Sequence, residues 1–216
     1  MKFFIFLFLL QIQTSLSAQE KKFRLMIDPG HGGNDAGAVS HKTKESDLVL
    51  SLAKKIQTLI STTQPSIEVQ LTRSQNKYVS LDDRIKNVDP DLYLSLHANS
   101  SISNQVTGME VYFQPEKKIK SKMAIDSIVE DLESIGKTKH SHLFSEKLQS
   151  QWSLSPSIMR RSGFYVIEKT SFPSVLIEIG FLTNPVEAEK LKTEAYQTQI
   201  AETIVNAVLD YKKSIQ

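Results

Sequence analysis

The sequence predicts a single α/β domain built on a six-stranded, mixed, mostly parallel twisted sheet with helices on both faces. Short β-compatible runs alternate along the chain with longer segments of helical periodicity, an order typical of parallel strands joined by crossover helices. One late run, Val175–Ile177, is continuously apolar, as expected of a central strand covered on both faces. The length of 216 residues suffices for one well-packed domain and is short for two.

Six runs of β-compatible residues are predicted as the strands. The first ends at Pro29 and Gly30, and the glycine-rich segment His31–Val39 that follows is predicted as a loop. The six predicted strands are Phe23–Asp28, Ile67–Thr72, Asp91–His97, Gly108–Phe113, Gly163–Glu168 and Ser174–Ile179. Ligands in such sheets bind beyond the carboxyl ends of the strands, so polar residues at those ends are candidates for a site.

Helices are predicted between and after these strands. In Ser46–Ile60, Leu48 and Leu52 fall on one apolar face. Asn184 followed by Pro185 supplies the cap and the first position of another helix. The other predicted helices are Leu81–Val88, Lys117–Gly136, Ser141–Trp152 and Glu194–Lys212.

The N-terminus, residues 1–18, is predicted to be a secretory signal peptide. Lys2 supplies a positive charge, Phe3–Leu10 an unbroken apolar run and Ser15–Ala18 small residues for cleavage. The alternative is a membrane anchor, but the apolar run is shorter than the roughly 20 residues that a spanning helix needs. Cleavage after Ala18 leaves residues 19–216 as the folded domain, without a membrane span, in the periplasm or cell envelope.

The composition of the sequence bears on binding to nucleic acid and on disulfide bonds. The formal net charge is +2, from 26 basic and 24 acidic residues, which gives no electrostatic basis for binding nucleic acid. The sequence has no cysteine, so it forms no disulfide and its stability must come from the core.

Three residues near strand ends or at a helix start are candidate metal ligands. His31 follows the first predicted strand, His97 ends the third, and Glu45 directly precedes the helix at Ser46. Each alone is consistent with a structural role, as a hydrogen-bonded histidine or a carboxylate that complements a helix dipole. Together, two histidines and a carboxylate are a common catalytic zinc set that leaves a fourth position for water. His41 is an alternative ligand.

Glu178 is the candidate general acid/base. It follows the apolar run Val175–Ile177 on the most buried predicted strand, where an unpaired charge costs stability. Burial raises the pKa of a carboxyl group, which suits a residue that takes a proton from water and returns it to a leaving amine. The alternative is a core glutamate held in a salt bridge.

Several separated motifs occur in a fixed order. They are Ile27–Ala38 (IDPGHGGNDAGA), Lys44–Leu48 (KESDL), Leu71–Arg73 (LTR), Leu81–Arg84 (LDDR), Ser95–Asn99 (SLHAN) and Ile177–Pro185 (IEIGFLTNP). With these motifs the sequence resembles the zinc-dependent N-acetylmuramoyl-L-alanine amidases, from about Phe23 to Tyr211.

The resemblance implies one Zn²⁺ per chain, held by His31, Glu45 and His97, with Glu178 as the catalytic residue. It implies hydrolysis of the amide bond between N-acetylmuramic acid and L-alanine in peptidoglycan, in cell-wall remodelling or daughter-cell separation. We expect a monomer that acts on peptidoglycan as its substrate.

The sequence also departs from the family pattern. Arg160–Gly163 differs from the usual approach to the fifth strand, and the segment after Pro115 is longer than the family core requires. Within it, residues 117–139 predict a helix with an apolar stripe and an acidic face. We hypothesise that this helix covers the zinc, with a carboxylate such as Glu130 in the open position, until a protein activator removes it. The alternative is a surface helix with a solvated acidic face.

Two other functions share these motifs. A degenerate amidase would bind wall peptides without cutting them, but the intact set of four residues argues against that function. A zinc peptidase would use the same chemistry on a peptide bond and would differ only in its pocket. Arg73 and Arg84 are expected to make structural ion pairs rather than to touch substrate.

Overall fold

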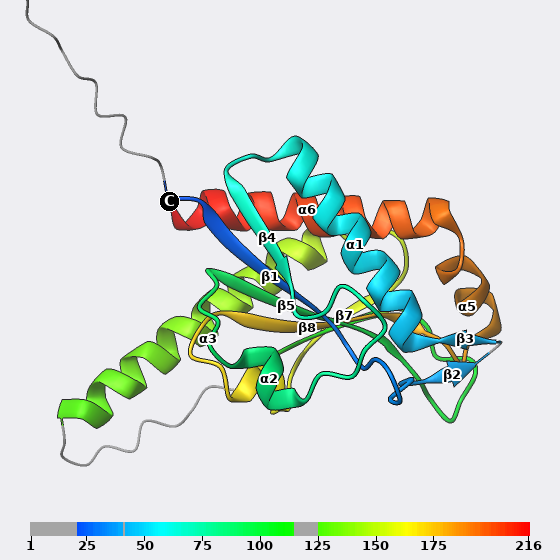
Figure 1. The fold of residues 1–216 in the computed structure, drawn as a ribbon, viewed down its shortest axis with the longest axis horizontal. Helices are drawn as coiled ribbons and strands as arrows, with labels where there is room; N and C mark the ends of the chain where they lie inside the picture. The colour runs from blue at the N-terminus through cyan, green and yellow to red at the C-terminus, as the bar shows by residue number, and fades with distance from the viewer. Residues whose placement is uncertain (1–20, 41, 115–124) are drawn as a thin grey trace, which may run out of the picture.

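The computed structural model describes residues 21–40, 42–114 and 125–216 (Figure 1). The elements are, in chain order, β1 (Phe23–Pro29), β2 (Val39–Ser40), β3 (Thr43–Lys44), α1 (Glu45–Thr63), β4 (Ile67–Leu71), α2 (Leu81–Ile85), β5 (Leu92–Asn99), β6 (Met109–Phe113), α3 (Ile125–Gln151), β7 (Ser157–Arg161), α4 (Tyr165–Glu168), β8 (Ser174–Phe181), α5 (Pro185–Leu191) and α6 (Glu194–Ile215). Strands and helices alternate, so the predicted α/β class is confirmed.

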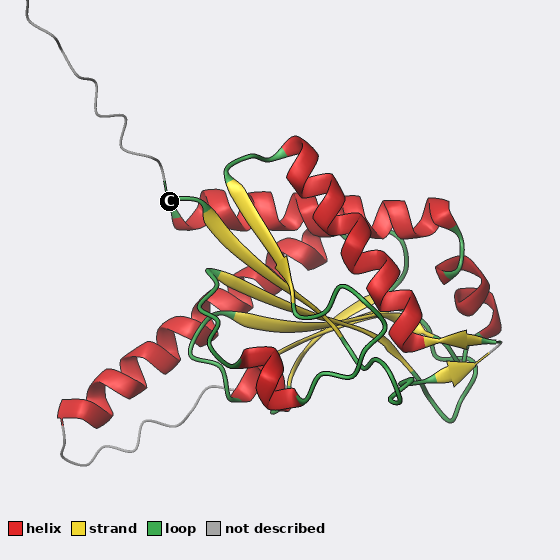
Figure 2. Cartoon of the chain, in the orientation of Figure 1, coloured by secondary structure: helices red, strands yellow, loops and turns green. Residues whose placement is uncertain are grey.

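Six strands form one twisted sheet in the order β4-β1-β5-β8-β6-β7 (Figure 2). Neighbouring strands run parallel except β6 and β8, which run antiparallel. The predicted mixed and mostly parallel sheet is therefore confirmed, with β5 and β8 at its centre. The sequence pattern does not foresee the small antiparallel pair of β2 and β3, which leads the chain into α1.

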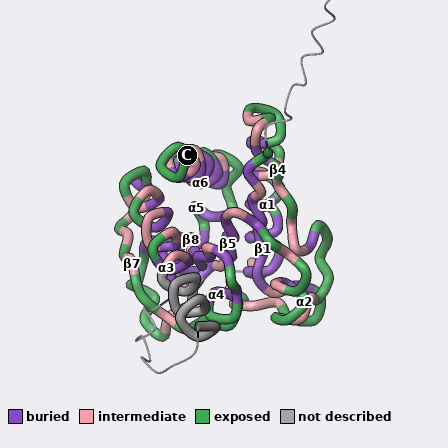
Figure 3. The backbone as a smooth tube through the Cα atoms, turned by 90° about the vertical axis from the view of Figure 1, so that its left-hand side faces the viewer, coloured by how far each residue is buried: buried purple, intermediate pink, exposed green. Residues whose placement is uncertain are grey.

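The two faces of the sheet are covered unequally. Alternate strand residues such as Leu25, Leu94 and Ile177 join a large apolar cluster with α1, α3 and α6. The residues between them point to the opposite face. There Tyr93 and Leu176 belong to a smaller cluster covered by α4 and, in part, by α2. Figure 3 shows the buried strands enclosed between these groups of helices.

The predicted strand Gly163–Glu168 is wrong. The sixth strand is instead β7, which pairs only with β6 at the edge of the sheet and leaves most of its residues partly or fully exposed. An edge strand needs no continuous apolar run, so the sequence Ser157–Arg161 gives only a weak strand signal. Val166 and Ile167 lie in the one-turn helix α4 and are buried in the smaller cluster.

The sequence predicts two helices where the structure has one, α3. A single glycine such as Gly136 weakens a helix by only about 1 kcal/mol relative to alanine. The helix is also anchored just beyond this glycine, because Lys137 Nζ donates hydrogen bonds of 2.6 Å to the carbonyls of Ile167 and Thr170. Residues 117–124 of the predicted covering helix lie outside the described residues.

The predicted signal peptide, residues 1–18, also lies outside the described residues, as does His41. Within the described ranges, no helix combines the length and apolar character that crossing a membrane requires. The signal peptide therefore stays a prediction from the sequence.

Candidate metal centre and active site

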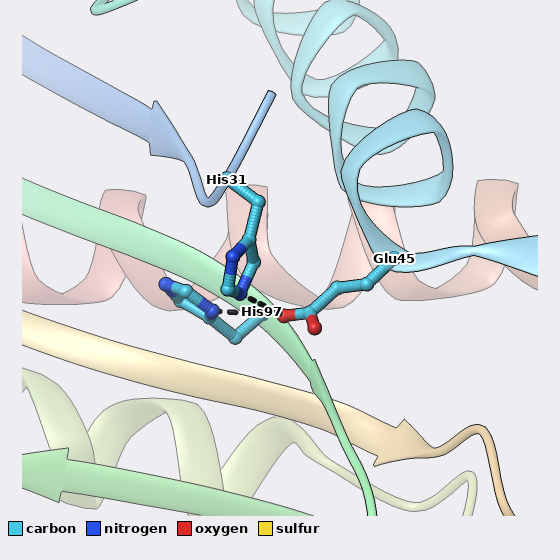
Figure 4. A group of neighbouring side chains, drawn as sticks. All are labelled: His31, Glu45 and His97. Atoms are coloured by element: carbon cyan, nitrogen blue, oxygen red, sulfur yellow. Dashed lines mark hydrogen bonds and ion pairs between the residues drawn. The ribbon is translucent and has the colours of Figure 1, made fainter. Parts of the chain in front are cut away.

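The carboxyl end of β1 delivers the first candidate ligand. His31 has a φ of 59°, in the left-handed region that residues other than glycine rarely occupy. Such conformations cluster at functional sites, where the surrounding structure over-determines them. In Figure 4 the ring of His31 points from this loop toward His97 and Glu45.

Two buried arginines hold the loop in place. Arg84 donates from Nη2 to the carbonyl of His31 at 2.7 Å and from Nη1 to the carbonyl of Pro29 at 2.9 Å. Arg73 donates from Nε to the same Pro29 oxygen at 2.9 Å and from Nη2 to the carbonyl of Gly30 at 2.8 Å. Three consecutive carbonyls are therefore bound by side chains that lie outside the candidate ligand set.

The predicted ion pair of Arg84 is confirmed. Its Nη1 lies 2.7 Å from Oδ1 of Asp28, and both side chains are almost fully buried. Burial alone would raise the pKa of Asp28, but the Arg84 charge and two hydroxyl hydrogen bonds hold it below its usual range. The hydroxyl donors are Thr72 and Ser95. The ion pair expected for Arg73 is wrong, because within the described chain its guanidinium donates only to backbone carbonyls.

The candidate carboxylate comes from the first residue of α1. Glu45 Oε1 accepts a hydrogen bond from the amide of Ala98 at 3.0 Å, and Oε2 accepts one from the amide of Ala38 at 2.8 Å. The side chain is only 5% exposed. Amides from β5 and from the loop after β1 therefore bind both oxygens and orient the carboxylate.

His97 on β5 completes the group. Glu45 Oε1 lies 2.8 Å from Nδ1 of His97 and 3.2 Å from Nε2 of His31 (Figure 4). The other ring nitrogen of His31, Nδ1, lies 2.9 Å from Oδ2 of Asp35. One donor atom from each of the three candidate ligands lies within 4.8 Å of the other two. The structure thus brings together His31, Glu45 and His97, as the sequence predicts.

Two glycines make room for these side chains. A Cβ atom at Gly30 would lie 2.3 Å from the ring of His97. One at Gly37, whose φ is +64°, would lie 2.5 Å from Oε2 of Glu45. Carbon atoms do not approach that closely without a shift, so any larger residue at either position would displace a candidate ligand.

The group attracts positive charge. The hydrogen bond with Glu45 raises the pKa of His31 to about 9, against an opposing contribution from burial. Burial would raise the pKa of Glu45, but the hydrogen bonds with His31 and His97 hold it well below its usual range. Two imidazoles and a carboxylate are donors that suit zinc and neighbouring transition metals. By donor type, spacing and the space the glycines leave, the group can hold a metal ion.

Comparison with known proteins identifies the family. The profile of the N-acetylmuramoyl-L-alanine amidase family matches residues 25–210. This chain belongs to that family. The amidase from Clostridium difficile 630 is 32% identical, with a TM-score of 0.71, over 91% of this chain and 100% of that one. The catalytic domain of the amidase CwlV from Bacillus (Paenibacillus) polymyxa is 29% identical, with a TM-score of 0.70, over 88% and 98%.

Full-length relatives of this amidase-family chain are longer. The N-acetylmuramoyl-L-alanine amidase AmiC of Escherichia coli O6:H1 is 28% identical in an alignment that covers 92% of this chain and 55% of AmiC. The probable cell wall amidase LytH of Staphylococcus epidermidis is matched over 62% of its length. The chain therefore spans little more than half the length of these curated relatives.

The fourth predicted residue of this family member lies beside the group. Glu178 is on β8, opposite His97 of β5 in the strand register. Its Oε2 is buried and has no hydrogen-bond partner among the described residues. Burial raises the pKa of Glu178 to about 7. The salt bridge of the alternative interpretation does not form within the described chain, so the carboxyl group is left available for proton transfer.

A cavity of about 490 Å³ opens over these residues, a size within the range of small-molecule sites in proteins. It lies on the sheet face that α2 and α4 cover incompletely. Its walls are Tyr78, Val79, Leu81 and Arg84 near α2, and Phe164, Tyr165 and Val166 near α4; its other lining residues are Asp28, Gly30, His31, Asp35, His97, Leu176 and Glu178.

Sequence reasoning missed two carboxylates of this site. Asp35 contacts His31, and Glu110 on β6 lies opposite Glu178 in the register. Their signal is present in the sequence, since Asp35 is inside the first family motif and Glu110 is a charged residue within the apolar strand Met109–Phe113.

Proposed function

We propose that this chain is a zinc-dependent hydrolase of the amide bond that joins N-acetylmuramic acid to L-alanine in peptidoglycan. One observation carries the proposal. In a chain of this amidase family, His31, Glu45 and His97 converge in the wall of a cavity beside Glu178, whose buried Oε2 has no hydrogen-bond partner among the described residues. Family membership supports the identity of the substrate bond. The geometry of the site supports a metal-dependent hydrolytic mechanism.

His31, Glu45 and His97 are the residues that would hold the zinc. A zinc ion bound there would polarise the amide carbonyl and lower the pKa of a bound water to about 7. Asp35 would act through His31, because a carboxylate on the distal ring nitrogen fixes the tautomer and orientation of a metal-binding histidine.

Glu178 performs the proton transfers in this proposal. Its carboxylate takes a proton from the attacking water as the C–O bond forms. It then gives the proton to the departing nitrogen of L-alanine as the C–N bond breaks. The products are a free carboxyl group on the lactyl ether of the sugar and a free amino group on the stem peptide. The pKa near 7 suits both halves of this exchange.

Digestion of purified peptidoglycan followed by mass analysis tests the function. An amidase releases intact stem peptides whose first residue is L-alanine. A zinc peptidase releases shortened peptides, and a binding module releases nothing. Either of the last two results, from protein that holds one zinc per chain, would reject the proposed activity.

The ligand assignment has its own test. His97→Ala should lose both bound zinc and activity, as measured by metal analysis and peptidoglycan release. His142→Ala is the matched control, because His142 lies on α3 and its ring contacts Phe113. A His97→Ala variant with full zinc and normal rate would show that the metal is held elsewhere.

We also propose that residues 1–18 direct export to the cell envelope, where the substrate lies. The apolar run and the small residues before Gln19 support this proposal. N-terminal sequencing of the protein recovered from the envelope should begin near Gln19, and a retained Met1 would reject cleavage.

Control by a partner remains a separate proposal. A neighbour of the same fold, the amidase CwlD of Clostridioides difficile, was solved in complex with the GerS lipoprotein. For this chain the support is the length of the insertion within 117–139 and the acidic face that its sequence predicts. Lys137 ties its end to the segment before β8, at the amino end of the strand whose carboxyl half carries Glu178. Replacing 117–135 with a short linker should speed wall digestion without a partner. An unchanged rate in a folded, zinc-loaded variant would end the inhibitory role.

A further inference from the structure

A row of polar side chains crosses the sheet beside the candidate metal group. In the strand register His97 of β5 lies opposite Glu178 of β8, and Glu178 lies opposite Glu110 of β6. The three side chains therefore share the face that bears the cavity. Glu110 is on the side of Glu178 that is away from the candidate ligands.

Glu110 is fully engaged, unlike its neighbour Glu178. Its Oε2 accepts hydrogen bonds from Nδ2 of Asn99 at 2.9 Å and from the hydroxyl of Tyr112 at 2.6 Å. Its Oε1 accepts one from Nε of Arg160 at 3.0 Å. A buried carboxylate with a partner on each oxygen is a rigid anchor, and here it anchors an arginine.

Arg160 presents the rest of its guanidinium to solvent. Its side chain is 49% exposed, and Nε forms its ion pair with Glu110. Among the described residues, no carboxylate lies against its two terminal nitrogens. The next residue, Arg161, points to the opposite face, where its guanidinium lies 5.7 Å from the ring centroid of Phe113. Of this adjacent pair, only Arg160 is directed toward the face of the cavity.

The order of the strands indicates which part of the sheet lies next to the departing stem peptide. In the proposed mechanism Glu178 gives its proton to the nitrogen of L-alanine, so the departing peptide leaves on the Glu178 side of the metal group. Beyond Glu178 on that side come β6 and then β7. Strands are spaced by about 4.8 Å, which places β7 roughly 10 Å from β8. Two extended residues of a peptide span about 7 Å, and the long arm of Arg160 covers the remainder.

We propose that Arg160, held by Glu110, binds a carboxylate of the stem peptide on the departing side of the scissile bond. This inference rests on the proposed amidase function and adds a specificity-determining residue to it. A planar guanidinium with free terminal nitrogens matches a carboxylate in a two-point contact. The ligand chemistry is an acidic residue placed one or two positions after L-alanine.

Two synthetic muramoyl peptides test the role of Arg160. They differ only at the second stem residue, whose carboxylate is free in one and amidated in the other. The wild type should have the lower KM for the free acid. Arg160→Gln should raise KM for the free acid about tenfold to a hundredfold, the range for a lost charge-assisted hydrogen bond, and leave its kcat unchanged. KM for the amide should not move.

The controls separate recognition from structure. Arg161→Gln removes the same charge from the adjacent residue on the other face and should leave both substrates unaffected. A loss of kcat on both substrates in Arg160→Gln would show that Arg160 acts through Glu110 and Glu178, and would overturn the proposal.

The KM values of the wild-type protein for the two substrates also test the proposal. If it cuts both substrates with equal KM, the recognition role is rejected while the amidase function stands, and this result needs no variant to fold. If it cuts neither, the proposed function itself fails, and the role of Arg160 fails with it.

Discussion

The two faces of the sheet are built from the same strands and serve different ends. On the face covered by α1, α3 and α6, alternate residues form a continuous apolar cluster. On the face covered by α2 and α4, the intervening residues include Asp28, Ser95, His97, Glu110 and Glu178, with only a small apolar cluster around them. Successive residues of one strand face opposite sides of the sheet. Packing of the apolar residues in the core therefore also fixes the positions of the polar residues next to them, which form the candidate active site.

Ile177 and Glu178 show the contrast most directly. They are neighbours on β8; Ile177 is fully buried in the large cluster, and Glu178 has a buried oxygen without a partner among the described residues. A substitution at either position therefore reports on one face alone.

The largest effect is expected for the rate of Glu178→Gln. The amide keeps the size of the side chain and cannot accept the proton, so the rate of amide hydrolysis should fall about 10²–10⁴-fold. Bound zinc and the urea midpoint should be retained, since no hydrogen bond of Oε2 is lost. Glu68→Gln, an exposed change on β4, is the control. A near-normal rate in Glu178→Gln would move the proton transfer to another residue.

The next largest effect is expected for Asp28→Asn, which alters the polar face without touching a candidate ligand. The change leaves Arg84 buried beside a neutral amide, which should cost about 3–5 kcal/mol of unfolding free energy. Asp89→Asn removes a largely exposed partner of Arg24 and should cost about 1 kcal/mol or less. Urea unfolding of both variants makes the measurement, and equal costs would mean that burial of the Asp28 pair is not decisive.

Ile177→Ala tests the apolar face. Removing a fully buried isoleucine should cost about 2–5 kcal/mol of stability, while the folded fraction keeps its zinc and most of its activity per molecule. Ile158→Ala, at an exposed edge position of β7, should change stability by about 0.5 kcal/mol or less. Loss of zinc from folded Ile177→Ala would show that the two faces are not independent.

The smallest effect is expected for the loss of stability at low pH that protonation of Asp28 causes. Its pKa is lower in the folded than in the unfolded state, so the unfolded chain takes up this proton first as the pH falls. The contribution is complete above the unfolded value of about 3.9 and is lost as the pH drops through the folded value. Urea midpoints from pH 7 downward should therefore fall more steeply for the wild type below about pH 4 than for Asp28→Asn. If the urea midpoints of the two proteins fall in parallel with pH, Asp28 does not contribute to the acid dependence of stability.

The sequence predicts the central elements and the candidate ligands because their signals are local. His31 lies between glycines after a strand, and Glu178 follows an apolar run. The sequence does not predict β7, because an edge strand with one partner needs no apolar pattern. It also gives the wrong partners for Arg73, since three of the four backbone carbonyls bound by its guanidinium reach it only after β1, α1 and the loop after β4 have packed together. Glu110 is missed for the same reason, because Asn99 and Arg160, two of its three hydrogen-bond partners, come from other strands.

The arginine-bound loop after β1 has a consequence for handling the protein. Its three carbonyls are held by Arg73 and Arg84, so hydrogen bonds within the protein hold the backbone that carries His31. A chelated sample should therefore remain folded and take up zinc again without refolding. Metal exchange could then be followed in a single preparation, with cobalt as a coloured substitute in the same donors.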